Sequence, residues 1–341
     1  MAGKIVTFGE IMLRLAPDDY ERIIQTNRFQ ATYGGGEANV AVSLAQFGDA
    51  AYFVTRLPDN ALGDAAIRTL SGYGVEVNHI IRGGNRIGIY FLEQGASIRP
   101  SKVIYDRTGS AIAEITTGML DWAAIFREKD WFHITGITPA ISATAAAVCL
   151  EAVKAARDVG LTISCDLNYR KRLWTRDEAR DVMAELVRYT DLIIANEEDA
   201  ADVFGIHAGA NDVKAGKLDG AQYRIVAEKL AALSGAGKIA ITLRESLSAS
   251  DNNWSALLFD GKKFYESRKY AIHIVDRVGG GDSFGAGLIH GLISGWEMQT
   301  ALEFAVAASA LKQTIPGDMN LVKEAEVLAV VQGDVSGRVQ R

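Results

Sequence analysis

Short apolar runs alternate with amphipathic segments along this 341-residue chain, and this alternation restricts the fold more than any other feature. Six apolar or β-branched runs predict buried strands, at residues 5–8, 52–55, 131–135, 162–165, 192–195 and 239–243. The segments between them predict helices at residues 37–47, 61–73, 142–159, 176–188 and 222–233. We therefore expect an α/β fold with a central, mostly parallel sheet covered by helices on both faces. Binding sites in such sheets lie beyond the carboxyl ends of the strands.

Two segments break this pattern, residues 14–33 and 87–107, because they lack helical periodicity and alternate like exposed strands. Within the second segment, residues 87–92 and 102–105 predict a hairpin pair. We expect a small β-sheet lid, formed from about 11–33 and 87–108, on a single α/β domain that spans residues 1–341. Residues 207–220 are polar and glycine-rich and predict a surface loop.

Composition narrows the partners and the compartment. The net charge of −6 argues against a nucleic-acid surface. The chain has two cysteines, Cys149 and Cys165, so a disulfide framework is not expected and a reducing cytoplasm fits. The N-terminal residues lack the apolar core of a signal peptide, and the most apolar helical stretch, 301–311, contains Glu303 and is too short to span a bilayer. No membrane partner is expected.

A glycine-rich run near the C-terminus, DRVGGGDSFGAG at 276–287, predicts the start of a helix. Glycines let the backbone approach a ligand, and a helix start offers unpaired N–H donors to an anion. A carboxylate at this place, Asp282, would repel phosphate unless it accepts a proton from a hydroxyl. The alternative is a glycine-rich turn in which Asp282 caps the helix. The run alone leaves both interpretations open.

A second glycine cluster, GGGEANVA at 34–41, also opens a predicted helix. Its spacing is not that of a dinucleotide fingerprint, and the chain contains neither a Walker A sequence nor the glycine-rich loop of protein kinases. The cluster predicts either a polar helix start that contacts a small substrate or a tight turn between lid and body.

Charged residues follow three of the predicted strands. Arg107 ends a lid strand and Arg170 follows the strand at 162–165, where a planar guanidinium could hold a carboxylate or form a structural ion pair. Asn196 and Asp199 follow the strand at 192–195. Carboxylates there can hold Mg²⁺ through water, or they can form the acidic first turn of a helix.

In these motifs the chain resembles the ribokinase-like (PfkB) carbohydrate kinases from about residue 4 to about residue 330. The cluster GGGEAN resembles their N-terminal signature, DRVGGGD their D-x-x-G-A-G-D signature, and residues 196–199 their N-x-x-E motif. The resemblance implies a ribokinase-like fold, ATP and Mg²⁺ as cofactors, and room for a monovalent cation. It implies that Asp282 is the catalytic base and that Gly279, Gly280 and Gly281 form an anion hole. The nucleotide side would comprise Asn196, Thr242, Arg244, Gly279 and Gly281, with Asp199 serving the metal through water.

Within the family the chain looks most like the 2-keto-3-deoxygluconate kinases, in the pieces GEIMLRL at 9–15, YDR at 105–107, DLNYR at 166–170 and PGD at 316–318. Those enzymes phosphorylate the terminal hydroxyl of an acidic keto-sugar to give 2-keto-3-deoxy-6-phosphogluconate. The resemblance implies that the sugar acid is met by Gly35, Gly36, Asn39, Tyr90, Tyr105, Arg107, Arg170 and Asp318. The alternatives are a neutral-sugar kinase, such as a fructokinase or ribokinase, and a binding protein without turnover. The exposed lid edges further predict a homo-oligomer.

Three departures from the family pattern concern the site. Gly280 stands where alanine is usual, which keeps the anion hole. Asp199 stands where the family has glutamate, so its carboxylate is one methylene shorter. Arg244 stands where many members have glycine in the nucleotide loop, which changes the expected contacts with ATP.

Overall fold

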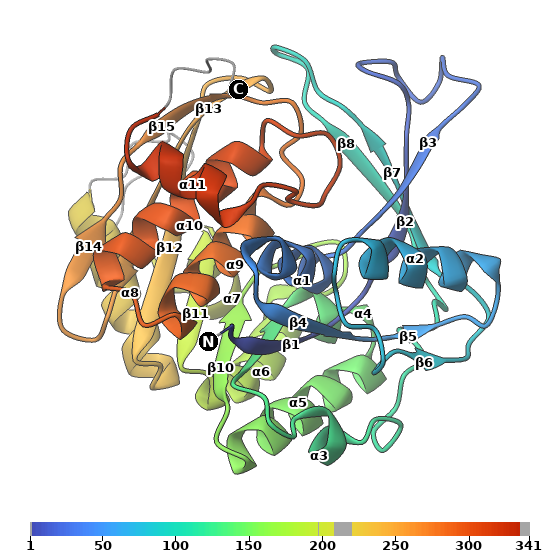
Figure 1. Ribbon diagram of the computed structural model, residues 1–341, viewed down its shortest axis with the longest axis horizontal. Coiled ribbons are helices and arrows are strands. Elements are labelled where there is room, and N and C mark those ends of the chain that lie inside the picture. Colours follow the sequence, from blue (N-terminus) through green and yellow to red (C-terminus); the bar gives the residue numbers. More distant parts are fainter. Residues whose placement is uncertain (1, 197, 208–219, 335–341) are drawn as a thin grey trace.

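A computed structural model describes residues 2–196, 198–207 and 220–334 of the chain (Figure 1). Its centre is a nine-stranded sheet in the order β14-β13-β12-β11-β10-β9-β1-β4, with β15 paired to β13. Within this sheet the neighbouring strands β4, β1, β9, β10, β11 and β12 run parallel. The pairings of β13 with β12, β14 and β15 are antiparallel. The bounds are β1 Lys4–Phe8, β4 Ala50–Val54, β9 Trp131–Thr135, β10 Thr162–Asp166, β11 Leu192–Asn196, β12 Lys238–Ser246, β13 Asp251–Phe259, β14 Phe264–Glu266 and β15 Tyr270–His273.

Helices cover both faces of this sheet. Successive residues of a strand point to opposite faces, so each strand contributes apolar side chains to both cores. Ile5 of β1 packs into one core cluster and Val6 into the other. The first face carries α1 Gly36–Phe47, α2 Ala61–Gly72, α9 Gly280–Ile293, α10 Met298–Lys312 and α11 Glu324–Val331 (Figure 1). The second carries α3 Trp122–Ile125, α4 Ile137–Ile141, α5 Ala143–Asp158, α6 Arg176–Leu186, a 3₁₀ turn Val187–Tyr189, α7 Asp199–Phe204 and α8 Gly220–Ser234.

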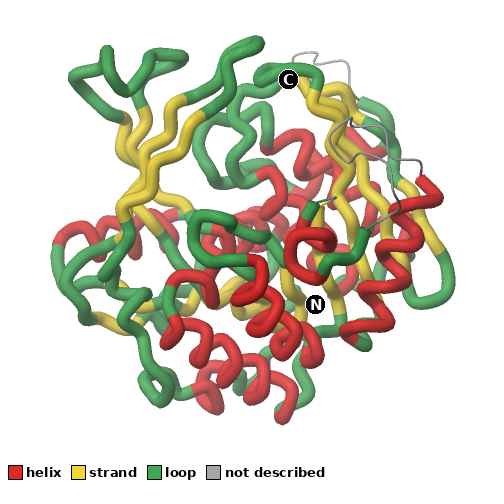
Figure 2. Tube along the Cα trace, turned by 180° about the vertical axis from the view of Figure 1, so that it is seen from behind, coloured by secondary structure: helices red, strands yellow, loops and turns green. Residues whose placement is uncertain are grey.

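A second, four-stranded sheet stands away from this body (Figure 2). Its order is β3-β2-β7-β8, so that β3 and β8 are edges. The strands are β2 Met12–Ala16, β3 Gln30–Gly34, β7 Gly88–Glu93 and β8 Lys102–Asp106. Apart from Gly34 at the end of β3, they lie within the two ranges from which the sequence predicts a lid, and β7 and β8 pair antiparallel as the predicted hairpin requires. A separate short pair links β5 Arg56–Leu57 to β6 Ile81–Arg82.

The predicted α/β architecture, a mostly parallel sheet between helices, is confirmed. The main difference is at one edge, where β13, β14 and β15 were not predicted from the sequence. These strands are joined by turns without intervening helices, so the alternation of strands and helices does not indicate them. Seven of the nine residues of β13 are buried, so this strand also lacks the alternation of apolar and polar residues. Most of the predicted loop at 207–220 lies outside the described residues, since 208–219 are not described.

Two predictions from the sequence, one on the cellular compartment and one on the membrane, can be compared with the described residues. Cys149 and Cys165 are both free and buried, and the reducing compartment they suggest stays a prediction. Within the part of the chain that is described, no helix is long and apolar enough to cross a membrane.

Candidate active site

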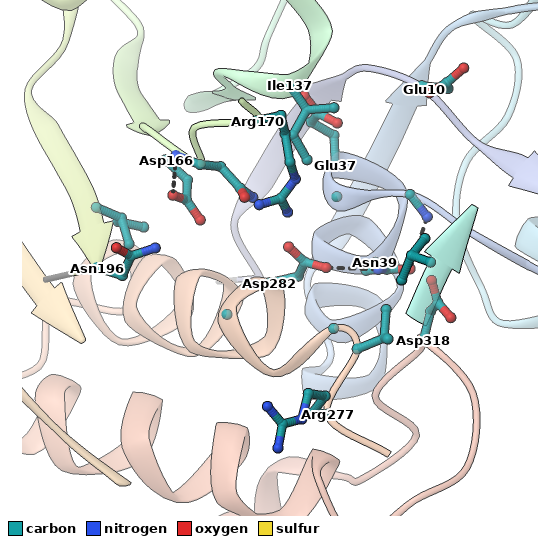
Figure 3. Close-up of a pocket in the computed structure, with 18 of the residues that line it drawn as sticks. Glu10, Glu37, Asn39, Ile137, Asp166, Arg170, Asn196, Arg277, Asp282 and Asp318 are labelled. Atoms are coloured by element: carbon teal, nitrogen blue, oxygen red, sulfur yellow. Dashed lines mark hydrogen bonds between the residues drawn. The ribbon is translucent and has the colours of Figure 1, made fainter. Parts of the chain in front are cut away.

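A cleft of about 340 Å³ lies where the carboxyl ends of the parallel strands meet the starts of α1 and α9 (Figure 3). Strands β7 and β8 of the lid sheet contribute its far wall. Among the described residues, every site residue predicted from the sequence lines this cleft except Gly280. We call the part formed by Asp282, Gly279 and Asn39 the body end, and the part formed by Glu10, Tyr105 and Arg107 the lid end.

Asp282 sits in the first turn of α9 at the body end. Its Oδ2 accepts a hydrogen bond of 2.7 Å from the side-chain amide of Asn39, which fixes the orientation of the carboxylate (Figure 3). Burial raises the pKa of Asp282 to about 6, while the Asn39 bond and the nearby Arg170 charge oppose that rise. A carboxylate with a pKa near 6 is mostly ionised at neutral pH and is still basic enough to accept a proton in a transition state.

The glycine run lets the chain reach α9 without a clash. Gly279 has a left-handed φ of 80°, and a Cβ on it would lie 1.9 Å from the backbone oxygen of Asp318. Gly281 faces open space, so that an anion can approach the N–H groups of the first helical turn. Gly280 points the other way, where a Cβ would meet Gln313 at 3.3 Å. The end of the flexible Gln313 side chain can shift to make room for a methyl group, which agrees with the alanine that family members have at this position.

The start of α1 supplies a second carboxyl group, Glu37, which is fully buried. Its Oε1 accepts bonds from the Thr135 amide at 3.0 Å and from the hydroxyls of Thr135 and Thr138 at 2.8 Å. Its Oε2 is buried without a hydrogen-bond partner among the described residues. Burial raises the pKa of Glu37 to about 7 in spite of these bonds. The predicted substrate contact Gly35 lies beside it, where a Cβ would be 1.9 Å from the Glu10 backbone oxygen.

A buried ion network joins the lid sheet to the loop before α9. Arg14 of β2 donates to Asp276 at 2.5 Å and to Asp318 at 2.6 Å, and the Tyr90 hydroxyl donates to Asp318 at 2.6 Å. The side chains of Arg14, Asp276 and Asp318 are each no more than 6% exposed. Two of the predicted substrate contacts, Tyr90 and Asp318, therefore hold each other as well as facing the cleft.

Arg107 reaches the lid end of the cleft with part of its guanidinium already engaged. Its Nη1 donates to Glu10 at 2.9 Å, and its guanidinium lies 4.7 Å from the centre of the Tyr105 ring. Both Arg107 and Glu10 are buried, and the Arg107 Nε has no hydrogen-bond partner among the described residues. Arg107 therefore fits both interpretations that the sequence left open. It forms a structural ion pair with Glu10, and its other N–H donors remain for the carboxylate of a ligand.

Arg170 lies nearer the body end, between the carboxylates that follow β10 and open α9 (Figure 3). Its charge lowers the pKa of Asp282, Asp166 and Asp199 against larger opposing effects. Burial, followed by repulsion from Asp199 and Asp282, nevertheless holds the pKa of Asp166 well above its ordinary value. Crowded carboxylates of this kind are stabilised when a cation approaches them.

On the nucleotide side predicted from the sequence, the polar groups are largely occupied by backbone. Asn196 Oδ1 accepts from the amides of Glu198 and Asp199, while Asp199 accepts from the amides of Tyr169 and Asn196 at 3.1 Å. Asp199 thus fastens the end of β11 to the loop after β10. The Thr242 hydroxyl donates to Ala195, and Arg244 lines the cleft. In the described chain no group of three acidic, histidine or cysteine side chains has the spacing that would hold a metal ion.

Residues 2–325, which contain this whole cleft, match the family described as pfkB family carbohydrate kinase. The chain belongs to the PfkB family of carbohydrate kinases. The family resemblance drawn from the two glycine motifs is therefore confirmed. In this kinase the two signatures are the starts of α1 and α9, which the fold packs side by side so that Asn39 and Asp282 meet.

Similar proteins cover the kinase from end to end. The solved structure of 2-dehydro-3-deoxygluconokinase from Thermotoga maritima is 50% identical, with a TM-score of 0.93, over 98% of this chain and 99% of that one. The 2-dehydro-3-deoxygalactonokinase of Haloferax volcanii is 34% identical over 339 residues, 99% of each chain. The 2-dehydro-3-deoxygluconokinase of Bacillus subtilis is 28% identical over 95% of this chain and 94% of its own.

Several residues in and behind the cleft of this kinase were not predicted from the sequence. Glu10, Glu37, Asp166 and Arg277 line the cleft, and Arg14 and Asp276 form the buried ion pair beside it. Arg14 had a usable signal, because a charge inside the apolar strand Met12–Ala16 requires a partner. Arg277 donates to the Ala249 backbone oxygen at 3.1 Å, and burial and then the Arg244 charge lower its pKa. Two neighbouring cations at the cleft wall suit a polyphosphate, which is a signal visible only in the folded chain.

Proposed function

We propose that this kinase is a 2-dehydro-3-deoxygluconokinase, which transfers the γ-phosphoryl group of ATP to the terminal hydroxyl of 2-keto-3-deoxygluconate, the same sugar acid under its other name. The observation that carries the proposal is a single cleft that contains a phosphate-type helix start with its carboxylate, Asp282, and two arginines, Arg107 and Arg170. A neutral sugar has no carboxylate for these two arginines to bind. The relative from Thermotoga maritima, at 50% identity, supports the same substrate.

In the proposed reaction Asp282 accepts the proton of the terminal hydroxyl as that oxygen attacks the γ-phosphorus. The bond to the bridging oxygen of ADP breaks, and the two products are the phosphorylated sugar acid and ADP. N–H groups at Gly279, Gly281 and Asp282 stabilise charge on the transferred group, and no covalent intermediate with the protein is needed. Asn39 keeps the carboxylate aimed at the hydroxyl, since it holds the second oxygen at 2.7 Å.

The sugar acid lies between lid and body in this proposal. Arg107 and Arg170 bind its carboxylate, and Tyr90, Tyr105 and Gly35 contact its remaining atoms. The backbone oxygen of Asp318 lies against Gly279, and the side chain of Gln313 lies against Gly280. Lid closure excludes water, which limits hydrolysis of ATP.

The residues present fit Mg²⁺ carried by the nucleotide and bound to the protein through water. Asp166, Asn196 and Asp199 lie at the ends of β10 and β11. Burial, and then the charges of Asp199 and Asp282, raise the pKa of Asp166, so a cation close to it would stabilise its ionised form. Both oxygens of Asp199 already accept backbone N–H groups, which suits contact through water better than direct ligation. When bound, Mg²⁺ neutralises charge on the phosphate oxygens. Thr242, Arg244 and Arg277 would face the nucleotide.

An ADP-release assay over a panel of sugars tests this function. We expect turnover with 2-keto-3-deoxygluconate and its galactonate epimer, and little with fructose or ribose. A preference for neutral sugars would replace the proposal by a fructokinase or ribokinase. Binding of ATP and sugar without ADP release would indicate a binding protein.

We also propose that two copies pair through the lid sheet. Among the described residues its edge strands β3 and β8 each pair on one side only, and Ile24, Ile98 and Ile104 on its loops and edge strand are 85%, 96% and 52% exposed. Exposed apolar residues beside an open strand edge favour association. Light scattering after gel filtration tests this, and a dimer that Ile104→Lys converts to monomer is the expected result. A wild-type monomer at all concentrations would contradict the proposal.

A further inference from the structure

A lysine ammonium is buried directly beneath the anion hole. Lys312 is the last residue of α10 and is 0% exposed. Its Nζ donates to two backbone oxygens, that of Asp276 at 3.0 Å and that of Ile315 at 3.4 Å. Within the described chain it forms no ion pair with a carboxylate. A fully buried ammonium without a paired carboxylate is costly, so its position calls for a reason.

The side chain of Lys312 lies against the turn that forms the proposed anion hole. A Cβ on Gly279 would lie 3.3 Å from the Lys312 Cε. Two other residues at the same end of α10 form hydrogen bonds with the turn and with the loop before it. The Gln313 backbone oxygen accepts from the amides of Val275 and Asp276, and the Ser309 hydroxyl donates to the Gly280 oxygen at 2.7 Å. Lys312 therefore joins the loop before α9 to the loop after α10 at the place where phosphate is expected.

The two carbonyl oxygens belong to these two loops, and their arrangement is that of a cation site with the cation attached to the chain. Lys312 is also the last residue of α10, and the C-terminal end of a helix favours a positive charge. Burial lowers the pKa of Lys312, and the Asp276 and Asp318 charges oppose that effect. Asp276 itself is fully engaged, since its Oδ1 accepts from Val278 and its Oδ2 from Gly317 and Arg14.

We propose that Lys312 is a built-in substitute for a dissolved monovalent cation. Its ammonium occupies the position between the Asp276 and Ile315 oxygens, fixes the anion hole and places a positive charge under the transferred phosphoryl group. The enzyme then needs neither potassium nor sodium for turnover. This inference rests on the proposed kinase function, and it makes Lys312 a positioning residue that acts through Gly279 and the N–H groups of α9.

Exchange of the salt around the wild-type enzyme is the first test. The assay uses the choline salt of ATP with magnesium chloride, in potassium, sodium or choline chloride at one ionic strength. We expect the same kcat in all three salts and the same melting temperature. Activity that appears only with potassium or sodium overturns the inference and leaves the kinase function intact. The absence of sugar phosphorylation in every salt contradicts the proposed function instead.

Two variants at the same position provide the second test. Lys312→Met keeps the length of the side chain and removes its charge, and we expect kcat to fall on the order of 10²-fold with little change in KM. Lys312→Ala leaves a cavity between the two carbonyl oxygens. Potassium or methylammonium chloride, but not choline chloride, should raise its activity and its melting temperature, because an ion that binds only the folded state stabilises it.

A matched control is Lys323→Met, since Lys323 is exposed and contacts Gln46, and it should behave like wild type in every salt. Unchanged kcat in Lys312→Met overturns the inference. An alanine variant that responds to no cation, in activity or in melting temperature, overturns it as well. If neither variant folds, the wild-type salt exchange decides.

Discussion

At the body end of the cleft the helix α9 is buried from Ser283 to Gly291, whereas at the lid end four of the five residues of β8 are exposed. At the body end both carboxyl groups are fixed by hydrogen bonds, since Asn39 donates to Asp282 and the hydroxyls of Thr135 and Thr138 donate to Glu37. At the lid end Arg107 has one carboxylate partner, an aromatic ring and an unused donor. In the proposed reaction the chemistry therefore lies in the more buried half of the cleft, and substrate choice lies in the half with the exposed strand.

This contrast predicts that changes at the body end alter kcat or stability, while changes at the lid end alter KM. The largest effect should come from Asp282→Asn, which keeps the size of the side chain and an oxygen for the Asn39 amide. Loss of the base should lower kcat by about 10³-fold, the usual contribution of general-base catalysis. Steady-state kinetics with a constant melting temperature would establish this. Near-normal turnover would remove Asp282 from its role.

Arg14→Met tests the junction between the two ends. It leaves Asp276 and Asp318 buried without their shared cation, so the free energy of unfolding should fall by about 3–5 kcal/mol. Urea unfolding measures this change. The control is Arg86→Met. Arg86 precedes the lid strand β7, its partner Asp106 is exposed, and its loss should cost less than about 1 kcal/mol. Equal effects of the two substitutions would show that the junction is not a structural link.

Glu37→Gln tests the buried carboxyl group at the body end through pH. The pKa of Glu37 is raised by burial from 4.5 to about 7, so the folded state holds a proton that the unfolded state releases. Its contribution to stability is fully present below about pH 4.5 and is lost as the pH rises through about 7, to a total of about 3 kcal/mol.

Urea unfolding of the wild type between pH 5 and 8 should therefore show stability falling as pH rises, and Glu37→Gln should show a shallower fall. Asp282 and Asp199 act in the same direction, since burial raises the pKa of each to about 6, so part of the slope should remain. Identical slopes in the two proteins would mean that Glu37 is ionised in the folded state.

The smallest effect is expected at the lid end. Replacing Arg107 alone would leave Glu10 buried and charged, so the informative variant is the pair Arg107→Met with Glu10→Gln. Loss of a charge-assisted bond should raise KM for the sugar acid by about 10–100-fold and leave kcat nearly unchanged. The companion variant Glu10→Gln keeps Arg107 and should bind the sugar acid at least as well as wild type. A lower kcat with constant KM in the double variant would place Arg107 in the chemistry rather than in substrate choice.

Local sequence determined the elements that need only local information. Short apolar runs predict the parallel strands, amphipathic segments predict most of their helices, and the glycine runs predict the helix starts at α1 and α9. These predictions succeed because backbone freedom and helix capping depend on a few neighbouring residues. The strands β13, β14 and β15 escaped them. β13 is buried along most of its length and shows no alternation, and β14 and β15 have only three and four residues.

Only the tertiary structure decided which charges meet. Arg14 bonds to residues 262 and 304 positions away, and Lys312 donates to an oxygen 36 positions away. A side chain's burial, pKa and partner depend on elements that the fold brings together from far along the chain, and no local pattern contains that information. The sequence by itself therefore predicted phosphate chemistry at the start of α9, and the packing of α10, β2 and the lid sheet determined the charges that surround it.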